Sequence, residues 1–125
     1  MIAVDTSSWI AYFQDESGRD VVLVDQALAD RQVCLPPIVF TELLSDPKLP
    51  SQVLSLLRVL PLLAPTEGYW ERAGFLRAKL LAVKRKAPLA DTLITQSCLD
   101  HDVRLIARDS DYHHFCAIAG LQLLS

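Results

Sequence analysis

The sequence predicts an α/β domain built on a central parallel sheet. Short apolar runs alternate along the chain with longer segments of helical periodicity, which is the order expected when each strand is followed by a crossover helix. The first run, residues 2–4, is apolar throughout, as in a strand whose two faces are both covered. The chain has 125 residues and is 51% apolar, which is enough for one core. We therefore expect a single domain over residues 1–125.

The expected strands follow from the apolar runs. Residues 60–63 contain Pro61, which lacks an amide hydrogen and is tolerated at the edge of a sheet. We expect residues 2–4 and 104–107 to be central strands, and an aspartate follows each of these runs closely. In chain order the expected strands are residues 2–4, 32–35, 60–63, 104–107 and 121–124.

The expected helices are marked by caps and prolines. Ser7 or Ser8 can cap a first helix that ends at Phe13. Pro37 suits the first turn of a helix that stops before Pro47. In chain order the expected helices are residues 7–13, 20–30, 37–46, 51–59, a long helix from residue 67 that runs until Pro88 interrupts it, and 89–99, with a short one before residue 121.

The helix expected after Thr66 has two distinct faces. Its apolar stripe advances by alternating steps of four and three residues: Tyr69, Ala73, Leu76, Leu80 and Val83. On another face, basic residues recur every seven positions: Arg72, Lys79 and Lys86. Residues 71–86 hold six Lys or Arg and one Glu in a chain of net charge −3. These three residues and Arg108 are weak candidates for binding an RNA backbone, and ordinary solvated charge is the alternative.

Four acidic residues are expected to meet at one edge of the sheet. Asp5 and Asp109 follow the two central strands, and the carboxyl ends of parallel strands line the working crevice of such a sheet. Glu42 lies one helical turn after Ile38, so it can point toward that edge. Asp91 opens a helix directly after a proline break and can reach the same opening. Each acid also has a plain alternative, as a cap, a turn former, a partner of the helix dipole or a solvated side chain.

Several carboxylates in one pocket indicate a bound cation. Each ionised neighbour raises the free energy needed to ionise the next, and a hard divalent cation with oxygen ligands removes that conflict. Mg²⁺ or Mn²⁺ fits this set. Zn²⁺ does not, because no His or Cys stands at the spacing of zinc ligands.

Four segments in order resemble the sequence blocks of the PIN-domain family, and most closely its short VapC-type toxins: VDTSSWIAYF, PPIVFTELLS, PLADTLITQSCLDHDVRLIARDSDY and GLQLL. The similarity spans nearly the whole chain. It implies a three-layer PIN-like fold with strand order 3-2-1-4-5 and a Mg²⁺- or Mn²⁺-dependent endoribonuclease that leaves a 5′-phosphate and a 3′-hydroxyl.

The resemblance also carries roles over to individual residues. The catalytic and metal-binding acids it implies are Asp5, Glu42, Asp91 and Asp109, with Asp111 as a further metal ligand. Ser7 matches the small polar residue that supports the site.

Two positions depart from the family's pattern. Ala107 stands where the fourth block usually has Thr or Ser, so a hydroxyl that could bond a carboxylate is missing. Tyr112 replaces a usual Phe, which reads as a mild change. Neither departure removes an acid. The alternatives are a catalytically degenerate PIN-fold module that binds RNA or protein, and a phosphate-handling receiver domain or phosphatase, whose motifs the sequence lacks.

Location and partners follow from composition and from the resemblance. Cys34, Cys98 and Cys116 are odd in number and form no CxxC pair, and no secretory leader or membrane span is evident, so we expect a cytoplasmic protein with reduced thiols. A VapC-like ribonuclease implies an RNA substrate, with transfer RNA a reasonable expectation, and a cognate antitoxin. The apolar segments 9–13 and 53–57 exceed what a small core needs, so we also expect a homodimer and a helical groove for an antitoxin segment.

Overall fold

A parallel sheet of three strands lies at the centre of the molecule. The computed structural model describes residues 1–124; Ser125, the last residue of the predicted domain, lies outside the described residues. The strands are β1 (Ile2–Val4), β2 (Val33–Cys34) and β3 (Arg104–Ile106), in the order β2-β1-β3. Ile2 pairs with Val33 on one side and with Arg104 on the other. The α/β class with a parallel sheet is confirmed.

The two expected outer strands are reduced to single parallel bridges. Leu35 pairs with Leu62 beyond β2, and Leu105 pairs with Leu123 beyond β3. At the first of these, Leu35 donates to the carbonyl of Pro61, and Leu63 donates back to Leu35. Pro61 itself has no amide hydrogen to extend the ladder. The five-strand order 3-2-1-4-5 therefore stays a prediction, with bridges rather than strands at its two ends.

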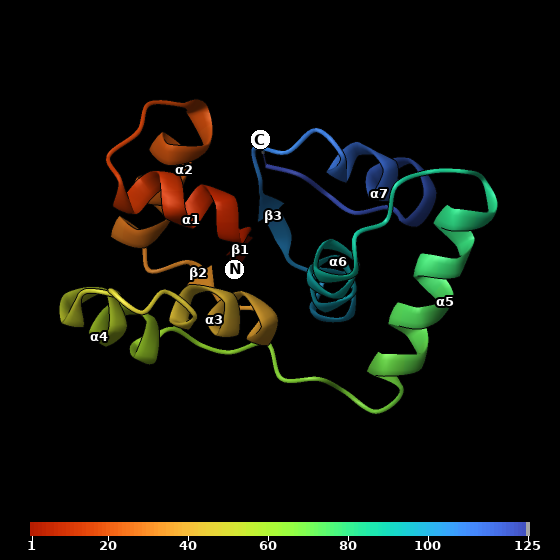
Figure 1. Ribbon diagram of the computed structural model, residues 1–125, viewed down its shortest axis with the longest axis horizontal. Coiled ribbons are helices and arrows are strands. Elements are labelled where there is room, and N and C mark those ends of the chain that lie inside the picture. The colour runs from red at the N-terminus through yellow and green to blue at the C-terminus, as the bar shows by residue number, and fades with distance from the viewer. Residues whose placement is uncertain (125) are drawn as a thin grey trace.

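Helices surround this sheet (Figure 1). They are α1 (Thr6–Phe13), α2 (Arg19–Ala29), α3 (Pro37–Leu44), α4 (Ser51–Val59), α5 (Tyr69–Ala82), α6 (Leu89–His101) and α7 (Tyr112–Ala119). Helix α1 packs on α2 and α3, and α3 also packs on α6. Helix α5 contacts α6 and α7 from the outside of the molecule (Figure 1). Among residues 1–124, no helix is both long enough and apolar enough to cross a membrane.

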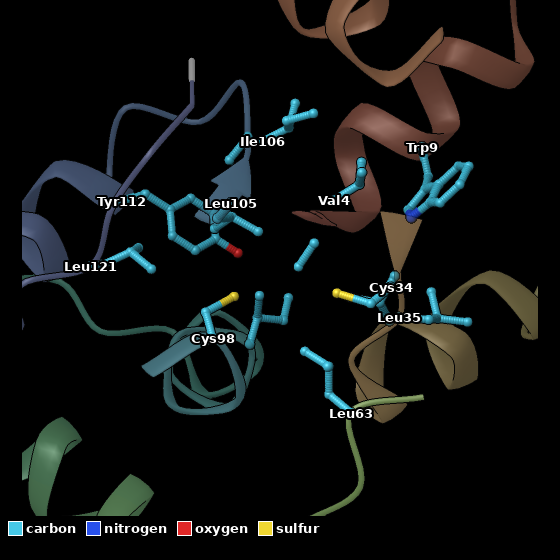
Figure 2. Packing of buried hydrophobic residues seen from close by; sticks show 14 of the residues in the cluster. Val4, Trp9, Cys34, Leu35, Leu63, Cys98, Leu105, Ile106, Tyr112 and Leu121 are labelled. Atoms are coloured by element: carbon cyan, nitrogen blue, oxygen red, sulfur yellow. The ribbon is translucent and has the colours of Figure 1, made fainter. Parts of the chain in front are cut away.

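The core lies between the sheet and these helices. Val4, Leu105 and Ile106 from the strands pack against Trp9 of α1 and against α6 and α7 (Figure 2). Cys34 and Cys98 are buried in this core as free thiols, and Cys116 is free and partly buried. The described residues share this hydrophobic core, and a single domain over residues 1–125 stays a prediction.

Helix α5 departs from its predicted length. Tyr69, Ala73, Leu76 and Leu80 are buried as the apolar stripe predicts, but Val83 is 56% exposed. The helix ends at Ala82, because Lys84 takes a left-handed backbone conformation (φ 59°) and the amide of Arg85 bonds the carbonyl of Leu80.

Two consequences of the helix ends correct the sequence prediction. Lys86 lies beyond the end of α5, so it does not share a helical face with Arg72 and Lys79. The cap of α1 was also predicted wrongly. It is Asp5, one of the acids of the expected site, rather than Ser7 or Ser8.

Candidate active site

Asp5 ends the central strand and begins the first helix. Its amide donates to the carbonyl of Ile106 at 2.9 Å, which ties the end of β1 to the end of β3. Its side chain caps α1 by accepting from the amide of Ser7 at 3.3 Å, and the Ser7 hydroxyl donates to the same Oδ2 atom at 2.5 Å. Asp5 is only 6% exposed, so its carboxylate is held rigidly at the sheet edge.

Asp91 approaches the same point from another element. It lies in the first turn of α6, directly after the N-cap Pro88, and is partly buried. The hydroxyl of Tyr112, the first residue of α7, lies 2.7 Å from Oδ1 of Asp5 and 3.3 Å from Oδ1 of Asp91. One tyrosine oxygen thus joins the ends of β1, α6 and α7.

Glu42 reaches the site from α3. Its side chain is exposed, and its Oε1 atom accepts a hydrogen bond of 2.7 Å from the hydroxyl of Thr6, the residue after Asp5. This contact brings Glu42 beside the start of α1. Sequence reasoning did not single out Thr6, although a hydroxyl next to the first acid was a usable signal.

Asp109 and Asp111 lie in the turn that joins β3 to α7. Oδ1 of Asp109 accepts from the amide of Asp111 at 2.9 Å, and Asp111 is the N-cap of α7 without a side-chain capping bond. Asp109 is exposed and Asp111 partly buried. Ala107 directly follows β3 and is 6% exposed, so a methyl group occupies the position where the family's pattern has a hydroxyl.

The pKa of Asp91 is affected by the other acids of the site. The pKa of Asp91 is raised to about 6, first by burial and next by the negative charge of Asp5. The charges of Asp109 and Glu42 raise this pKa further, whereas the hydrogen bond from Tyr112 lowers it. Asp91 therefore lies near enough to the other three predicted acids for their charges to act on it, and the roles of these residues stay predictions.

The donor set fits a divalent cation. Carboxylate oxygens are the ligands that Mg²⁺ and Mn²⁺ prefer, and every acidic side chain predicted for this site offers them. Among residues 1–124, no three acidic, His or Cys side chains are already gathered closely enough for one ion. Glu42 and Asp109 are the exposed members of the set.

Two of the basic residues predicted to bind RNA are engaged in ion pairs. Arg72 bonds Asp100 at 2.7 Å. Arg108 bonds Asp20 through Nε at 2.8 Å and also reaches Glu16 at 3.3 Å.

The acid that Arg108 contacts is itself buried. The guanidinium of Arg108 lowers the pKa of Asp20, which is 5% exposed and also accepts from Ser8. This ion pair connects the first turn of α2 to Arg108, the residue before Asp109. In residues 1–124 neither Lys79 nor Lys86 forms an ion pair, and both are exposed. RNA binding by these residues stays a prediction, with the two lysines its better candidates.

An apolar groove of about 460 Å³ runs beside the acidic site. Glu42 and Asp46 provide its acidic edge, and Lys48 lies among its lining residues. Its apolar lining comes from α1, α3, α4 and the loop before α4: Ile10, Phe13, Leu43, Leu49, Pro50 and Val53. The groove therefore lies between the two segments that the sequence marked as too apolar for the core alone.

Comparison with known proteins agrees with this architecture. The family model described as the PIN domain matches residues 2–120. The chain is similar to a VapC ribonuclease of Mycobacterium bovis and to ribonuclease VapC11 of Mycobacterium tuberculosis. Each is 27% identical over 132 aligned residues, with 100% of this chain and 98% of the relative covered.

Solved structures share the fold at lower identity. A toxin–antitoxin complex from Klebsiella pneumoniae contains a chain with a TM-score of 0.72 and 21% identity, covering 97% of this chain and 95% of that one. A VapBC2 structure from Rickettsia felis, bound to a DNA fragment from its promoter, gives a TM-score of 0.74 and 20% identity, with 98% and 97% covered.

Proposed function

Because the chain belongs to the PIN-domain family, we propose that it is a Mg²⁺- or Mn²⁺-dependent endoribonuclease and the toxin of a toxin–antitoxin pair. The observation that supports this proposal is the approach of Asp5 and Asp91 to one Tyr112 hydroxyl, with Glu42 held beside Asp5 by Thr6. The two curated relatives are named as VapC ribonucleases, which supports RNA as the substrate.

The residues of the site have separable tasks. Asp5, Asp91 and Asp109 would hold the cation, with Glu42 and Asp111 as further ligands. The chemistry that such an ion supplies is Lewis acidity toward the scissile phosphodiester and a water acidic enough to act as nucleophile.

The neighbouring hydroxyls hold the acids in place. Ser7 fixes one oxygen of Asp5, and Thr6 holds Glu42 beside it. Without a cation the clustered carboxylates would repel an RNA phosphate, so the substrate backbone can enter only when their charge is offset.

The deciding experiment measures RNA cleavage by the purified protein with Mg²⁺, with Mn²⁺ and with EDTA. We expect cleavage only with a metal and at least a hundredfold loss in Asp5→Asn, because each acid supplies part of the charge that holds the ion. Glu67→Gln, which changes an exposed acid outside the site, is the matched control and should cleave normally. Metal-independent cleavage would contradict the mechanism. RNA binding without cleavage under any of these conditions would favour the degenerate binding module.

The groove beside Glu42 supports an antitoxin partner. We propose that an amphipathic antitoxin segment lays its apolar face against Phe13 and Val53 and brings an Arg or Lys toward Glu42, where it competes with the metal for the acidic site. The chain with a similar fold from Klebsiella pneumoniae was solved as a toxin–antitoxin complex, which supports such a partner.

Exposed apolar side chains support a homodimer. Trp70 and Phe75 on α5 are 68% and 71% exposed, more than an isolated small domain favours. We expect light scattering of the isolated protein to give about twice the chain mass of 13.9 kDa. We also expect purification from the native operon to bring down a small inhibitory protein. A monodisperse monomer without an inhibitor would leave a stand-alone nuclease.

The groove can be tested separately from dimerisation. Val53→Glu should prevent the inhibitor from binding, because it places a charge in the apolar lining while leaving every acid of the site in place. Cleavage by this variant should survive addition of the inhibitor.

A further inference from the structure

Tyr112 is a polar side chain that lies among the acids of this site and was not predicted to belong to it. It begins α7, is 0% exposed, and packs its ring against Phe115 with the centroids 6.0 Å apart. Its hydroxyl points into the interior from the α7 side (Figure 2). Burying a hydroxyl is unfavourable unless it is hydrogen-bonded. The hydrogen-bond partners of Tyr112 therefore indicate its role at the site.

Both partners are carboxylates of the proposed metal site. The hydroxyl oxygen lies 2.7 Å from Oδ1 of Asp5 and 3.3 Å from Oδ1 of Asp91. A hydroxyl has one proton to donate, so the two carboxylates share it, with the shorter and stronger bond to Asp5 and the longer one to Asp91. Because both Oδ1 atoms contact the same hydroxyl oxygen, this oxygen sets how far apart the two carboxylates lie.

The contact fixes the orientation of Asp5 from two sides. Ser7 donates to its Oδ2 atom, and Tyr112 donates to its Oδ1 atom. With the Ser7 amide and hydroxyl on Oδ2 and the Tyr112 hydroxyl on Oδ1, the carboxylate cannot rotate about its Cβ–Cγ bond without losing a hydrogen bond. Oδ1 accepts only the bond from Tyr112, so it still has a lone pair to offer a cation.

We propose that Tyr112 is a positioning residue that holds Asp5 and Asp91 in the arrangement that binds the metal. This inference rests on the proposed metal site. The four-block resemblance has a phenylalanine at this position, and a phenyl ring would fill the same space without orienting a carboxylate. The hydroxyl is thus an addition of this chain to the site.

The expected effect is on metal affinity. Residues that orient metal ligands through hydrogen bonds contribute about 10- to 100-fold to affinity when they are removed. We therefore expect Tyr112→Phe to bind Mn²⁺ about 10-fold more weakly than the unaltered protein. The readout is free Mn²⁺ in a titration followed by electron paramagnetic resonance, without RNA present.

Tyr69 provides the matched control. It is also buried, at 4% exposed, and its hydroxyl donates to the backbone carbonyl of Leu93 at 2.7 Å rather than to an acid. Tyr69→Phe removes a hydrogen bond of similar length from a buried tyrosine. The Tm measured without metal should therefore fall in both variants. Only Tyr112→Phe should lose Mn²⁺ affinity.

A measurement on the unaltered protein keeps the test independent of the variants. The chain has three tyrosines, so their ring Cζ resonances can be resolved by ¹³C labelling. Titration with Mg²⁺ should shift the Tyr112 resonance with the same midpoint as metal binding and leave that of Tyr69 in place. Unchanged affinity in Tyr112→Phe, or a Tyr112 resonance that ignores Mg²⁺, would overturn the positioning role. Failure of the unaltered protein to bind Mn²⁺ would overturn the metal site itself.

Discussion

Replacing Asp91 by asparagine should stabilise the metal-free protein at neutral pH while abolishing cleavage. The side chain is partly buried among three other acids, and these surroundings raise its pKa from 3.8 to about 6. Asparagine has nearly the same shape and carries no charge. The substitution therefore removes the repulsion and keeps an oxygen that can accept from Tyr112.

The pH dependence follows from which state holds the proton more tightly. Between about pH 4 and pH 6 the folded protein keeps the Asp91 proton and the unfolded chain releases it, so the free energy of unfolding falls as the pH rises through this window. Below this window both states are protonated, and above it the destabilisation is complete. Asp91→Asn has no such titration, so its advantage over the unaltered protein should be absent near pH 4 and full above pH 6.

The magnitude follows from the same pKa values. A carboxyl whose pKa lies at about 6 instead of 3.8 holds its proton more tightly by about 3 kcal/mol. Asp91 is partly exposed, and solvent screens its neighbours, so we expect about 1 to 2 kcal/mol at pH 7.5. For a domain of this size that corresponds to a rise of roughly 3 to 8 °C in Tm.

The assay is urea or thermal unfolding in EDTA at pH 4.5 and pH 7.5. Glu67→Gln removes the same charge from an exposed position and should differ little from the unaltered protein at either pH. Added Mn²⁺ should stabilise the unaltered protein and have little effect on Asp91→Asn. If Asp91→Asn is equally or less stable than the unaltered protein at pH 7.5, the acids do not crowd Asp91 and the convergence argument fails.

Further predictions concern the backbone and the RNA surface. Gly18→Ala should cost about 1 to 3 kcal/mol, because φ is +149° there and a Cβ would lie 2.6 Å from a carboxylate oxygen of Asp20. Gly74→Ala has open space within α5 and should instead stabilise by about 0.5 to 1 kcal/mol, so urea midpoints should move in opposite directions. Reversing the charges of Lys79 and Lys86 should weaken RNA binding and flatten its salt dependence without changing stability. An unchanged affinity across the salt series would make both lysines ordinary solvated charges.

The sequence predicted the elements well where periodicity and caps are local. The stripe of α5 and the strand before Asp109 follow from residues that are neighbours along the chain. The end of α5 was missed because Lys84 adopts a left-handed conformation that is usually taken by glycine. The outer strands were overpredicted because a bridge and a strand have the same apolar pattern.

The acids of the site were predictable, but the residues that orient them were not. Asp5 and Asp109 stand at strand ends, Glu42 and Asp91 lie on helices expected to reach the same edge, and the family resemblance adds the roles expected of them. The bond from Tyr112 to Asp5 joins residues 107 positions apart. No spacing rule connects such a pair, so the tyrosine looked like a conservative exchange for phenylalanine.

The same reasoning explains why the basic residues were hardest to interpret. A cation in a sequence can face RNA or an internal acid, and only the folded chain distinguishes the two. Arg108 follows a central strand, next to an acid of the site, yet its guanidinium closes on Asp20. The acids of the site have hydroxyl donors, Ser7, Thr6 and Tyr112, instead of arginines. Hydroxyls orient carboxylates without neutralising them, so the site keeps the net negative charge that a divalent cation requires.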